Sequence, residues 1–352
     1  MSRRCLKCGT VYEGDARFCP KDGSPLVDVP AAAAPASAPS SATLVRKAPS
    51  ATSMAERAAS LSNQLLDSRY EVLRKIGEGG MSYVYEAKEM GGTETVAIKV
   101  LSPKLGADKT SVERLRREAG LAMRLKHPNA CPILRMGETE DGLIYLVMPF
   151  LKGELLSDRE VRLGPLAVEL AVLWLAEICA GLHHAHQLNI VHRDLKPENI
   201  MLVPGADGYE HAIVMDFGLA KENRSDPGVA KLTATGIILG TPEFMSPEQI
   251  RGKPLDARSD IYALGIVAFE MFTGKLPFQG RNAQEMMIAR LRGQPVPARQ
   301  YQPDFPPKLE KALMRSLEAN PDNRYATALE FGIAMAEALG PGYHEKVKDV
   351  LQ

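Results

Sequence analysis

The sequence lacks net charge, and this limits the partners of the chain. Its 43 lysines and arginines balance 43 aspartates and glutamates over 352 residues. A chain without excess positive charge generates no overall field that would attract nucleic acid or an anionic membrane surface. We therefore expect no nucleic-acid partner, and we expect any phosphate group to be bound by a local arrangement of side chains.

Long apolar runs and cysteines are also scarce. No apolar segment near the first residue is typical of a signal sequence, and the most apolar late run, residues 261–272, is too short to cross a bilayer. The sequence therefore predicts no membrane span and a cytoplasmic location. The five cysteines are an odd number, and three of them lie between Cys5 and Cys19, which favours reduced thiols or metal ligands over a disulfide framework.

Composition divides the chain into four parts. Residues 29–68 contain Ala/Pro/Ser-rich runs such as AAAAPASAPSS, which offer too little apolar surface to stabilise an ordered structure, so a flexible linker is predicted. The linker separates a small module, residues 1–28, from a long segment, residues 69–339, and leaves residues 340–352 as a short tail. In the long segment, period-two patterns such as ETVAIKVL precede helical patterns, which predicts an α+β domain with a β-rich lobe before a helical lobe.

Two patterns in the β-rich part indicate a site for a phosphorylated ligand. The stretch IGEGGMSYV carries Gly77 and Gly79 in a turn, and glycines let backbone N–H groups approach an anion closely, although a plain hairpin has the same pattern. In ETVAIKV, alternation places Ala97 and Lys99 on one face of a strand, where they suit a flat ring and its phosphate tail. The alternative is a lysine exposed on a half-solvated strand.

The helix predicted after this strand contains a carboxylate within its apolar stripe. The residue is Glu118, and a carboxylate buried without a cation is destabilising by on the order of several kcal/mol. Lys99 is therefore predicted to be its partner, whereas a position at the edge of the stripe that reaches solvent is the alternative. The stripe consists of Val112, Leu115, Ala119 and Ala122.

The stretch VHRDLKPEN, residues 191–199, places ionisable and amide side chains directly after an apolar helix pattern. Residues 69–339 resemble the eukaryotic-like (Hanks-type) Ser/Thr protein kinases of bacteria. The resemblance rests on this stretch and on six further motifs in the order and spacing of the family, namely GEGGMSYV, VAIK, Glu118, MDFG, SPE and Arg324. The resemblance implies the bilobal protein kinase fold, ATP with Mg²⁺ or Mn²⁺, and transfer of the γ-phosphate to Ser/Thr hydroxyls of proteins, including a second copy of the chain.

The resemblance also implies catalytic roles for four of the motif residues. Lys99, held by Glu118, would orient the α- and β-phosphates. Asp194 would accept the proton of the acceptor hydroxyl, and Lys196 would offset the charge on the γ-phosphate.

A nucleotide and its metal ion would be bound by a second set of residues that the resemblance implies. Asn199 and Asp216 would hold Mg²⁺. Ser82 stands where the family has a third glycine, and Pro149 stands where it usually has an acidic residue, but adenine would still bond to the backbone carbonyl of that residue and to the N–H of Leu151. The full set expected around the nucleotide is Gly77, Gly79, Ser82, Val84, Ala97, Lys99, Met148, Pro149, Leu151, Met201, Asn199 and Asp216.

The same family resemblance implies roles in substrate specificity and in stabilising the fold for four further positions. Lys196 and Thr241 match the Ser/Thr branch of the family. Glu248 is expected to form a structural salt bridge with Arg324, and Asp260 is expected to brace the catalytic loop.

A segment rich in hydroxyls, KLTATGIILGT, precedes the SPE motif. Its Thr233 and Thr235 resemble the autophosphorylation site of bacterial kinases. A phosphate there would add a charge of about −1.5 to −2 and would give Arg193 oxygen acceptors, which would order the segment. The alternative is that both threonines are ordinary polar residues of a loop.

Two functions from other classes compete with that of an active kinase. A pseudokinase scaffold would lack one of Lys99, Asp194, Asn199 and Asp216, and all four are present. A zinc-ribbon adaptor with a regulatory kinase-like domain would be favoured by a strongly basic N-terminal module, whereas the charges of residues 1–28 nearly cancel. The balance of charge favours a protein partner for that module.

Metal-ligand spacing is present in the N-terminal module. Cys5 and Cys8 form a C-x₂-C pair, and after ten intervening residues Cys19 and Asp22 form a C-x₂-D pair, which resembles a zinc ribbon with an aspartate as its fourth ligand. About thirty residues cannot bury enough surface to fold without a metal or a cross-link. Asp22 is also a turn signal together with Gly23, so a turn is the alternative for that residue.

The spacing predicts one Zn²⁺ per chain in residues 1–28. Metal analysis of protein purified without chelators should find zinc at a ratio of about one, and absence of zinc would refute the module. Asp22→Cys should tighten zinc binding if Asp22 is a ligand, because thiolate is a stronger zinc ligand than carboxylate, and should change little if Asp22 only makes a turn.

Overall fold

A computed structural model of the chain resolves two compact units, Met1–Lys47 and Ala48–Gln352. The residues that the structure describes are 2–5, 11–13, 26–28, 51–79, 82–102, 109–217 and 242–351. In the first unit, β1 (Ser2–Cys5) pairs antiparallel with β2 (Val11–Glu13) and with β3 (Leu26–Asp28). The side chains of the four predicted zinc ligands, Cys5, Cys8, Cys19 and Asp22, lie outside the described residues.

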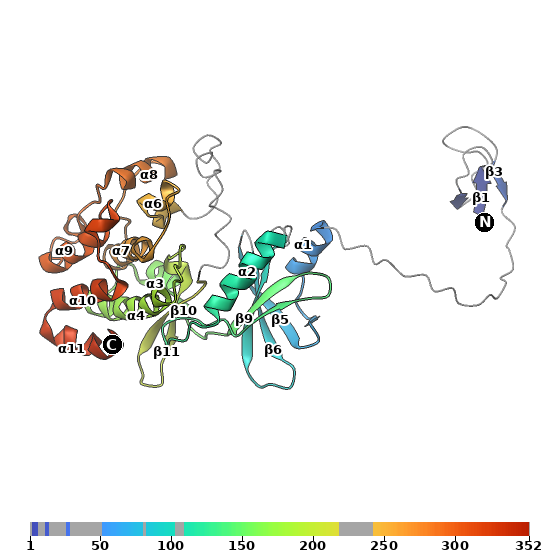
Figure 1. The fold of residues 1–352 in the computed structure, drawn as a ribbon, viewed down its shortest axis with the longest axis horizontal. Coiled ribbons are helices and arrows are strands. Elements are labelled where there is room, and N and C mark those ends of the chain that lie inside the picture. The colour runs from blue at the N-terminus through green and yellow to red at the C-terminus, as the bar shows by residue number, and fades with distance from the viewer. Residues whose placement is uncertain are drawn as a thin grey trace. The chain divides into compact units, whose positions relative to one another are not determined.

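The second unit contains an antiparallel sheet of six strands, in the order β4-β5-β6-β7-β9-β8. Strands β5, β6 and β9 of this sheet are labelled in Figure 1. The bounds are β4 Leu65–Leu66, β5 Tyr70–Gly79, β6 Ser82–Glu89, β7 Thr95–Leu101, β8 Arg135–Glu138 and β9 Ile144–Pro149. The predicted alternation along β7 is confirmed, because Ile98 and Val100 are buried in one apolar cluster and Ala97 in another. Lys99 therefore shares the face of Ala97.

Helix α2 (Lys109–Ala122) packs against the Ala97 face of this sheet. Its predicted stripe is confirmed, since Ala119 and Ala122 are buried with Ala97, Leu146 and Met148. The apolar side of α2 therefore packs on the face of β7 that also carries Lys99.

The opposite face of the sheet is covered by a segment that the sequence assigned to the linker. Residues 51–68 were expected to be flexible, but they contain helix α1 (Ala51–Ala59) and strand β4. Ala58 and Leu61 are buried in the cluster of Ile98 and Val100, and Tyr85 donates a hydrogen bond of 2.7 Å from Oη to the carbonyl of Ala58. The prediction was wrong because the apolar side chains are sparse and gain their stability from the sheet beneath them.

The C-terminal tail, predicted as residues 340–352, is also part of the folded unit. Helix α11 (Pro341–Leu351) packs against α4 (Val168–Gln187) and α10 (Ala328–Leu339), and its Val347 and Leu351 are buried in the core of the helical lobe. The boundary at Leu339 is therefore the end of α10 and not the end of the packed structure.

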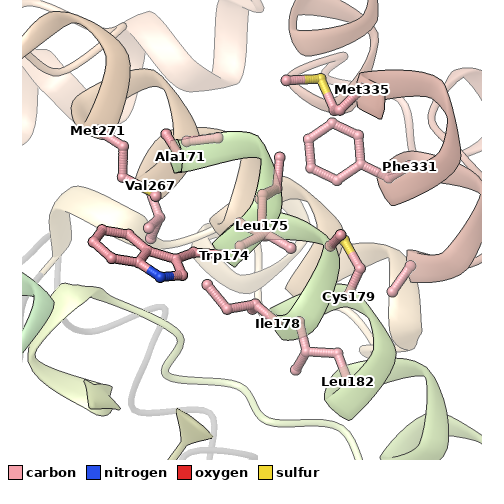
Figure 2. Packing of buried hydrophobic residues seen from close by; sticks show 14 of the residues in the cluster. Ala171, Trp174, Leu175, Ile178, Cys179, Leu182, Val267, Met271, Phe331 and Met335 are labelled. Carbon is pink, nitrogen blue, oxygen red and sulfur yellow. The ribbon is translucent and has the colours of Figure 1, made fainter. Parts of the chain in front are cut away.

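The helical lobe is organised around α4 (Val168–Gln187), whose apolar surface is buried on several sides. In Figure 2, Trp174 and Leu175 of α4 lie between Val267 and Met271 of α7 and Phe331 of α10. By length and hydropathy α4 could cross a membrane, but 67% of its apolar window is buried inside the lobe, as in the core helix of a folded domain. The other helices are α3 Leu156–Leu163, α6 Pro247–Ile250, α7 Ala257–Thr273, α8 Ala283–Arg292, α9 Pro307–Ser316 and α10 Ala328–Leu339.

A small antiparallel sheet packs on α4 through its strand β12. It has the order β10-β11-β12, with the bounds Glu154–Leu155, Ile200–Pro204 and Glu210–Val214. Strand β11 follows the VHRDLKPEN stretch and β12 leads into the MDFG stretch, so the hairpin brings the two motifs side by side.

We predict that the packing of residues 51–66 stabilises the whole unit. Leu61→Ala should lower the free energy of unfolding by about 2–4 kcal/mol, because it opens a cavity at a side chain that is only 1% exposed. Leu65→Ala, at a leucine 53% exposed, should change it by less than about 0.5 kcal/mol. Denaturant unfolding of both variants checks this, and equal small effects would mean that the segment behaves as the linker that composition suggested.

Candidate active site

The VHRDLKPEN loop is held from below by one buried carboxylate. Asp260, in the first turn of α7, accepts hydrogen bonds from the backbone N–H of His192 at 2.7 Å and of Arg193 at 2.9 Å. Its Oδ2 also lies 2.8 Å from Nε2 of His186. Burial acts to raise the pKa of Asp260, but these donors outweigh it and hold the pKa below its ordinary value. The predicted bracing of the loop by Asp260 is confirmed.

The loop brings Asp194, Lys196 and Asn199 together. Asn199 donates from Nδ2 to the carbonyl of Asp194 at 2.7 Å, and the ammonium of Lys196 lies 3.7 Å from Oδ2 of Asp194. Arg193 adopts a left-handed backbone with φ of 67°, a costly conformation for a residue with a side chain. The hydrogen bonds around it keep Asp194 in this geometry.

Asp216 is the second carboxylate of the site, and its partner comes from the other lobe. Its Oδ2 lies 2.8 Å from Nζ of Lys99 on β7. Burial acts to raise the pKa of Asp216, but Lys99 outweighs it, so the pKa lies below its ordinary value. Sequence reasoning paired Lys99 with Glu118, and the ion pair with Asp216 was missed because no local pattern links residues so far apart. Glu118 is half-buried on α2, and its contact with Lys99 stays a prediction.

His192 connects the two motifs. Its Nε2 lies 2.7 Å from the carbonyl of Met215, and its ring meets that of Phe217 edge to face at a centroid distance of 5.0 Å. The N–H of Met215 donates to the carbonyl of Asn199 at 2.8 Å. Asp216 is thereby fixed beside Asn199, with a left-handed φ of 60°.

Apolar side chains predicted to contact a nucleotide gather in one cluster. Ala97 and Met148 are buried there, and Val84 and Leu151 are partly buried against them. Ile213 of β12 and Met215, just after β12, join the same cluster, and sequence reasoning missed both because this apolar stretch reads as ordinary core. The cluster has the composition of a site for a flat ring.

The predicted strands lie beside this cluster, but Gly77 and Gly79, which were predicted in the turn between them, belong to strand β5, because the strand pairing continues to the end of β5. Gly77 pairs with Val84 and Gly79 with Ser82 in the β5–β6 hairpin, and Pro149 ends β9. Met201 lies on β11, where the chain passes close to Gly153, since a Cβ at Gly153 would be 2.1 Å from the carbonyl oxygen of Leu202. Only glycine fits that approach.

The side chains of Asn199 and Asp216 suit a hard cation. Asn199 and Asp216 offer an amide oxygen and a carboxylate oxygen, the ligand types that Mg²⁺ prefers. The bond from Nδ2 of Asn199 to the carbonyl of Asp194 fixes which end of the amide is left for a metal. The donor set therefore fits Mg²⁺.

Four glutamates from separate segments act on one another electrostatically, and sequence reasoning missed them. Burial, together with Glu270 of α7 and Glu198 of the loop, raises the pKa of Glu160 on α3 to about 9. Burial, Glu198 and Glu243 raise the pKa of Glu270 to about 7. No local signal could have revealed the group, because each member comes from a different part of the chain.

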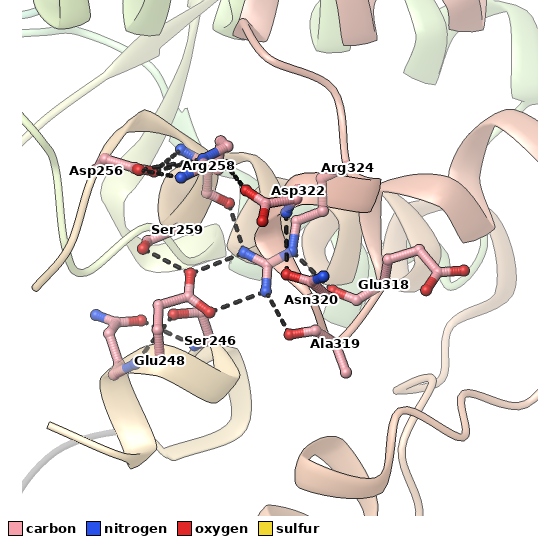
Figure 3. Close-up of polar contacts among 11 residues, drawn as sticks. Ser246, Glu248, Asp256, Arg258, Ser259, Glu318, Ala319, Asn320, Asp322 and Arg324 are labelled. Carbon is pink, nitrogen blue, oxygen red and sulfur yellow. Dashed lines mark hydrogen bonds and ion pairs between the residues drawn. The ribbon is translucent and has the colours of Figure 1, made fainter. Parts of the chain in front are cut away.

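The SPE motif is anchored by a buried ion pair (Figure 3). Arg324 donates to both carboxylate oxygens of Glu248, at 2.7 and 2.8 Å, and Ser259 donates to the same carboxylate at 2.7 Å. Arg324 also donates to the carbonyls of Arg258 and Glu318, and its guanidinium lies 4.7 Å from the centroid of the Tyr262 ring. The predicted salt bridge is confirmed, and its remaining hydrogen bonds offset the cost of burial.

The predicted phosphorylation sites, Thr233 and Thr235, lie outside the described residues, as do Thr241 and the glycine of MDFG.

Comparison with known proteins identifies similar sequences. A family model described as protein kinase domain matches residues 70–332. The serine/threonine-protein kinase pkn3 of Myxococcus xanthus is 39% identical over 265 residues, which are 75% of this chain and 48% of that protein. The serine/threonine-protein kinases PknB of Mycolicibacterium smegmatis and PrkC of Bacillus subtilis are 40% and 38% identical, over 76% and 75% of this chain but 42% and 39% of their own lengths. The chain thus spans less than half of these relatives.

Solved protein kinase structures have a fold similar to that of this chain. The kinase domain of Mycobacterium tuberculosis PknI superimposes with a TM-score of 0.62 at 27% identity, and the match covers 79% of this chain and 98% of that one. The match supports the bilobal architecture.

The cluster of glutamates predicts a pH-dependent stability. The folded pKa of Glu160 lies above the value of about 4.5 for an unfolded chain, so the stability tied to this group is present below that pH and is lost as the pH rises toward about 9. Glu160→Gln should therefore gain free energy of unfolding over the wild type between about pH 5.5 and pH 8, by on the order of 2 kcal/mol.

Denaturant unfolding at several pH values measures this gain. Glu113→Gln, at an exposed position of α2, is the matched control and should show no such trend. A difference for Glu160→Gln that is the same at every pH would contradict the prediction.

Proposed function

The chain belongs to the protein kinase family, and on this basis we propose that it transfers the γ-phosphate of ATP to Ser or Thr hydroxyls of proteins. The observation that carries the proposal is the position of Asp216, which contacts Lys99 of the β-rich lobe and lies beside Asn199 of the catalytic loop. In this proposal Lys99 is the cation, Asn199 and Asp216 are the metal-binding pair and Asp194 is the base. Phosphoryl transfer requires mainly such positioning and neutralisation of charge.

The family resemblance suggests a role for each residue, and the contacts of the residues are consistent with these roles. Asp194 would accept the hydroxyl proton of the protein substrate, and Lys196, 3.7 Å from its carboxylate, would stabilise negative charge on the transferred group. Lys99 would orient the phosphates, with Glu118 holding it from α2. Asn199 and Asp216 would bind Mg²⁺, which supplies charge neutralisation when bound.

Specificity for Ser and Thr is supported by two features. Lys196 stands two residues after Asp194, as in the Ser/Thr branch that the sequence resembles. The relatives at 38–40% identity are named serine/threonine-protein kinases. A pseudokinase is disfavoured, because the set of Lys99, Asp194, Asn199 and Asp216 is complete and the described contacts join its members.

Regulation by autophosphorylation is part of the proposal. Thr233 or Thr235 of one copy would be the substrate of another, and the added phosphate would provide acceptor oxygens for Arg193. The support is the Thr-Ala-Thr pattern between the MDFG and SPE motifs.

The N-terminal unit is proposed to bind zinc and a protein partner. Cys5 ends the central strand of a three-stranded sheet, and the spacing of Cys8, Cys19 and Asp22 suits a tetrahedral site. The near balance of its charges favours a protein over nucleic acid as the partner. A cytoplasmic site of action follows from the kinase proposal and the supply of ATP.

Asp194→Asn should abolish phosphate transfer and leave ATP binding within about twofold of the wild type, because Asp194 contacts the acceptor and not the nucleotide. Asp216→Ala should weaken Mg²⁺·ATP binding as well as the rate. Transfer of labelled phosphate to a basic protein substrate and nucleotide titration measure the two effects. Equal loss of nucleotide affinity in both variants would argue against the role of Asp194.

Replacing both threonines of the segment between the MDFG and SPE motifs should reduce the rate of phosphate transfer to other protein substrates by at least about tenfold. Thr233→Ala combined with Thr235→Ala tests this, with phosphate located in the wild type by mass spectrometry. The idea fails if both threonines are unmodified in fully active enzyme.

A further inference from the structure

Gln249 uses both ends of its side-chain amide. In α6, its N–H donates to Oγ of Ser246 at 3.3 Å, and its Oε1 accepts from the N–H of Ser246 at 2.8 Å, which forms a capping box. The other end, Nε2, donates to the backbone carbonyl of Arg193 at 2.8 Å. One side chain therefore joins the helix of the SPE motif to the residue before Asp194.

The carbonyl of Arg193 belongs to a backbone that needs support. Arg193 is left-handed, with φ of 67°, and Asp260 holds the N–H groups of His192 and Arg193. Gln249 holds the carbonyl of the same residue. The peptide groups on both sides of Arg193 are thus fixed, one set from α7 and the other from α6.

Helix capping does not explain why this residue is glutamine. Glutamate completes a capping box as well as glutamine does. A carboxylate, however, has no N–H to donate, and it would place an oxygen opposite the carbonyl oxygen of Arg193. The bond to Arg193 is therefore the contact that distinguishes glutamine from glutamate here.

The helix that carries Gln249 is itself fixed to the helical lobe. Its neighbour Glu248 is held by Arg324 and Ser259. In the turn just before it, the carbonyl of Glu243 accepts a hydrogen bond of 2.5 Å from Arg290, whose side chain is 1% exposed. Residues 242–250 are thus fixed to the helical lobe, and the hydrogen bond from Gln249 connects them to the catalytic loop.

We propose that Gln249 is a positioning residue for phosphate transfer, an inference that rests on the proposed kinase function. It couples the segment that follows the predicted phosphorylation sites to the backbone of Arg193, and so sets the position of the Asp194 carboxylate. The hydrogen bonds that the structure describes for the Gln249 side chain join it to Ser246 and Arg193, and none of them goes to Lys99 or Met148. Loss of Gln249 should affect the chemical step and spare ATP binding.

Gln249→Glu separates this role from helix capping, because it keeps the acceptor for Ser246 and removes the donor for Arg193. We expect kcat to fall about 10- to 100-fold, since a misplacement of about 1 Å at a catalytic group has effects of that order. The KM for ATP should stay within about twofold and the Tm near that of the wild type. Hydrogen exchange of the amides in residues 190–199 should be faster.

Two matched variants complete the test. Ser246→Ala removes the cap and keeps the bond to Arg193, so its Tm should fall by more than that of Gln249→Glu and its kcat by less. Gln294→Glu makes the same change of charge at an exposed glutamine and should leave kcat, Tm and exchange unchanged.

The proposal is overturned if Gln249→Glu has the kcat and the hydrogen exchange of the wild type. It is also overturned if Gln249→Glu and Ser246→Ala lose kcat in the same proportion to their loss of Tm. A wild-type protein that transfers no phosphate would refute the proposed function instead. In that case the exchange of residues 190–199 still decides whether Gln249 positions the loop.

Discussion

The buried carboxylate of Asp260 is the contact on which the active site depends. It binds two successive backbone N–H groups of the catalytic loop and approaches His186 of α4, so it connects α7, α4 and the loop at one point. An ionised carboxylate with 1% exposure is stable only because donors surround it. The left-handed backbone at Arg193 persists because these bonds, with the bond from Gln249, leave it no other conformation.

The helical lobe provides the rigid body to which these contacts are attached. Its core packs α4 against α7 and α10, and polar side chains extend from that core to each functional segment. Arg324 holds the SPE motif through Glu248, and Arg290 holds the turn at Glu243. The β-rich lobe contributes Lys99, whose ion pair with Asp216 joins the two lobes.

The folded unit extends beyond the limits that composition suggested at both ends. Met54, Ala58 and Leu61 were too few to mark residues 51–66 as ordered, and Val347 and Leu351 were too few to mark α11. Their apolar side chains fit surfaces that exist only after the sheet and α4 have formed. A sparse apolar pattern is therefore ambiguous in sequence, because the stability of such a segment comes from its neighbours and not from its own propensity.

The sequence by itself determined the order of the lobes, the strand that carries Lys99, the stripe of α2 and the identity of the motif residues, since these depend on local periodicity and on spacing along the chain. The salt bridge of Glu248 with Arg324 and the bracing by Asp260 were also predictable from the family resemblance. Only the tertiary structure decided that Lys99 pairs with Asp216, that glutamates of separate segments raise the pKa values of Glu160 and Glu270, and that Gln249 reaches Arg193. These contacts join residues separated by dozens of positions, and their energies depend on distance and burial, which no local pattern encodes.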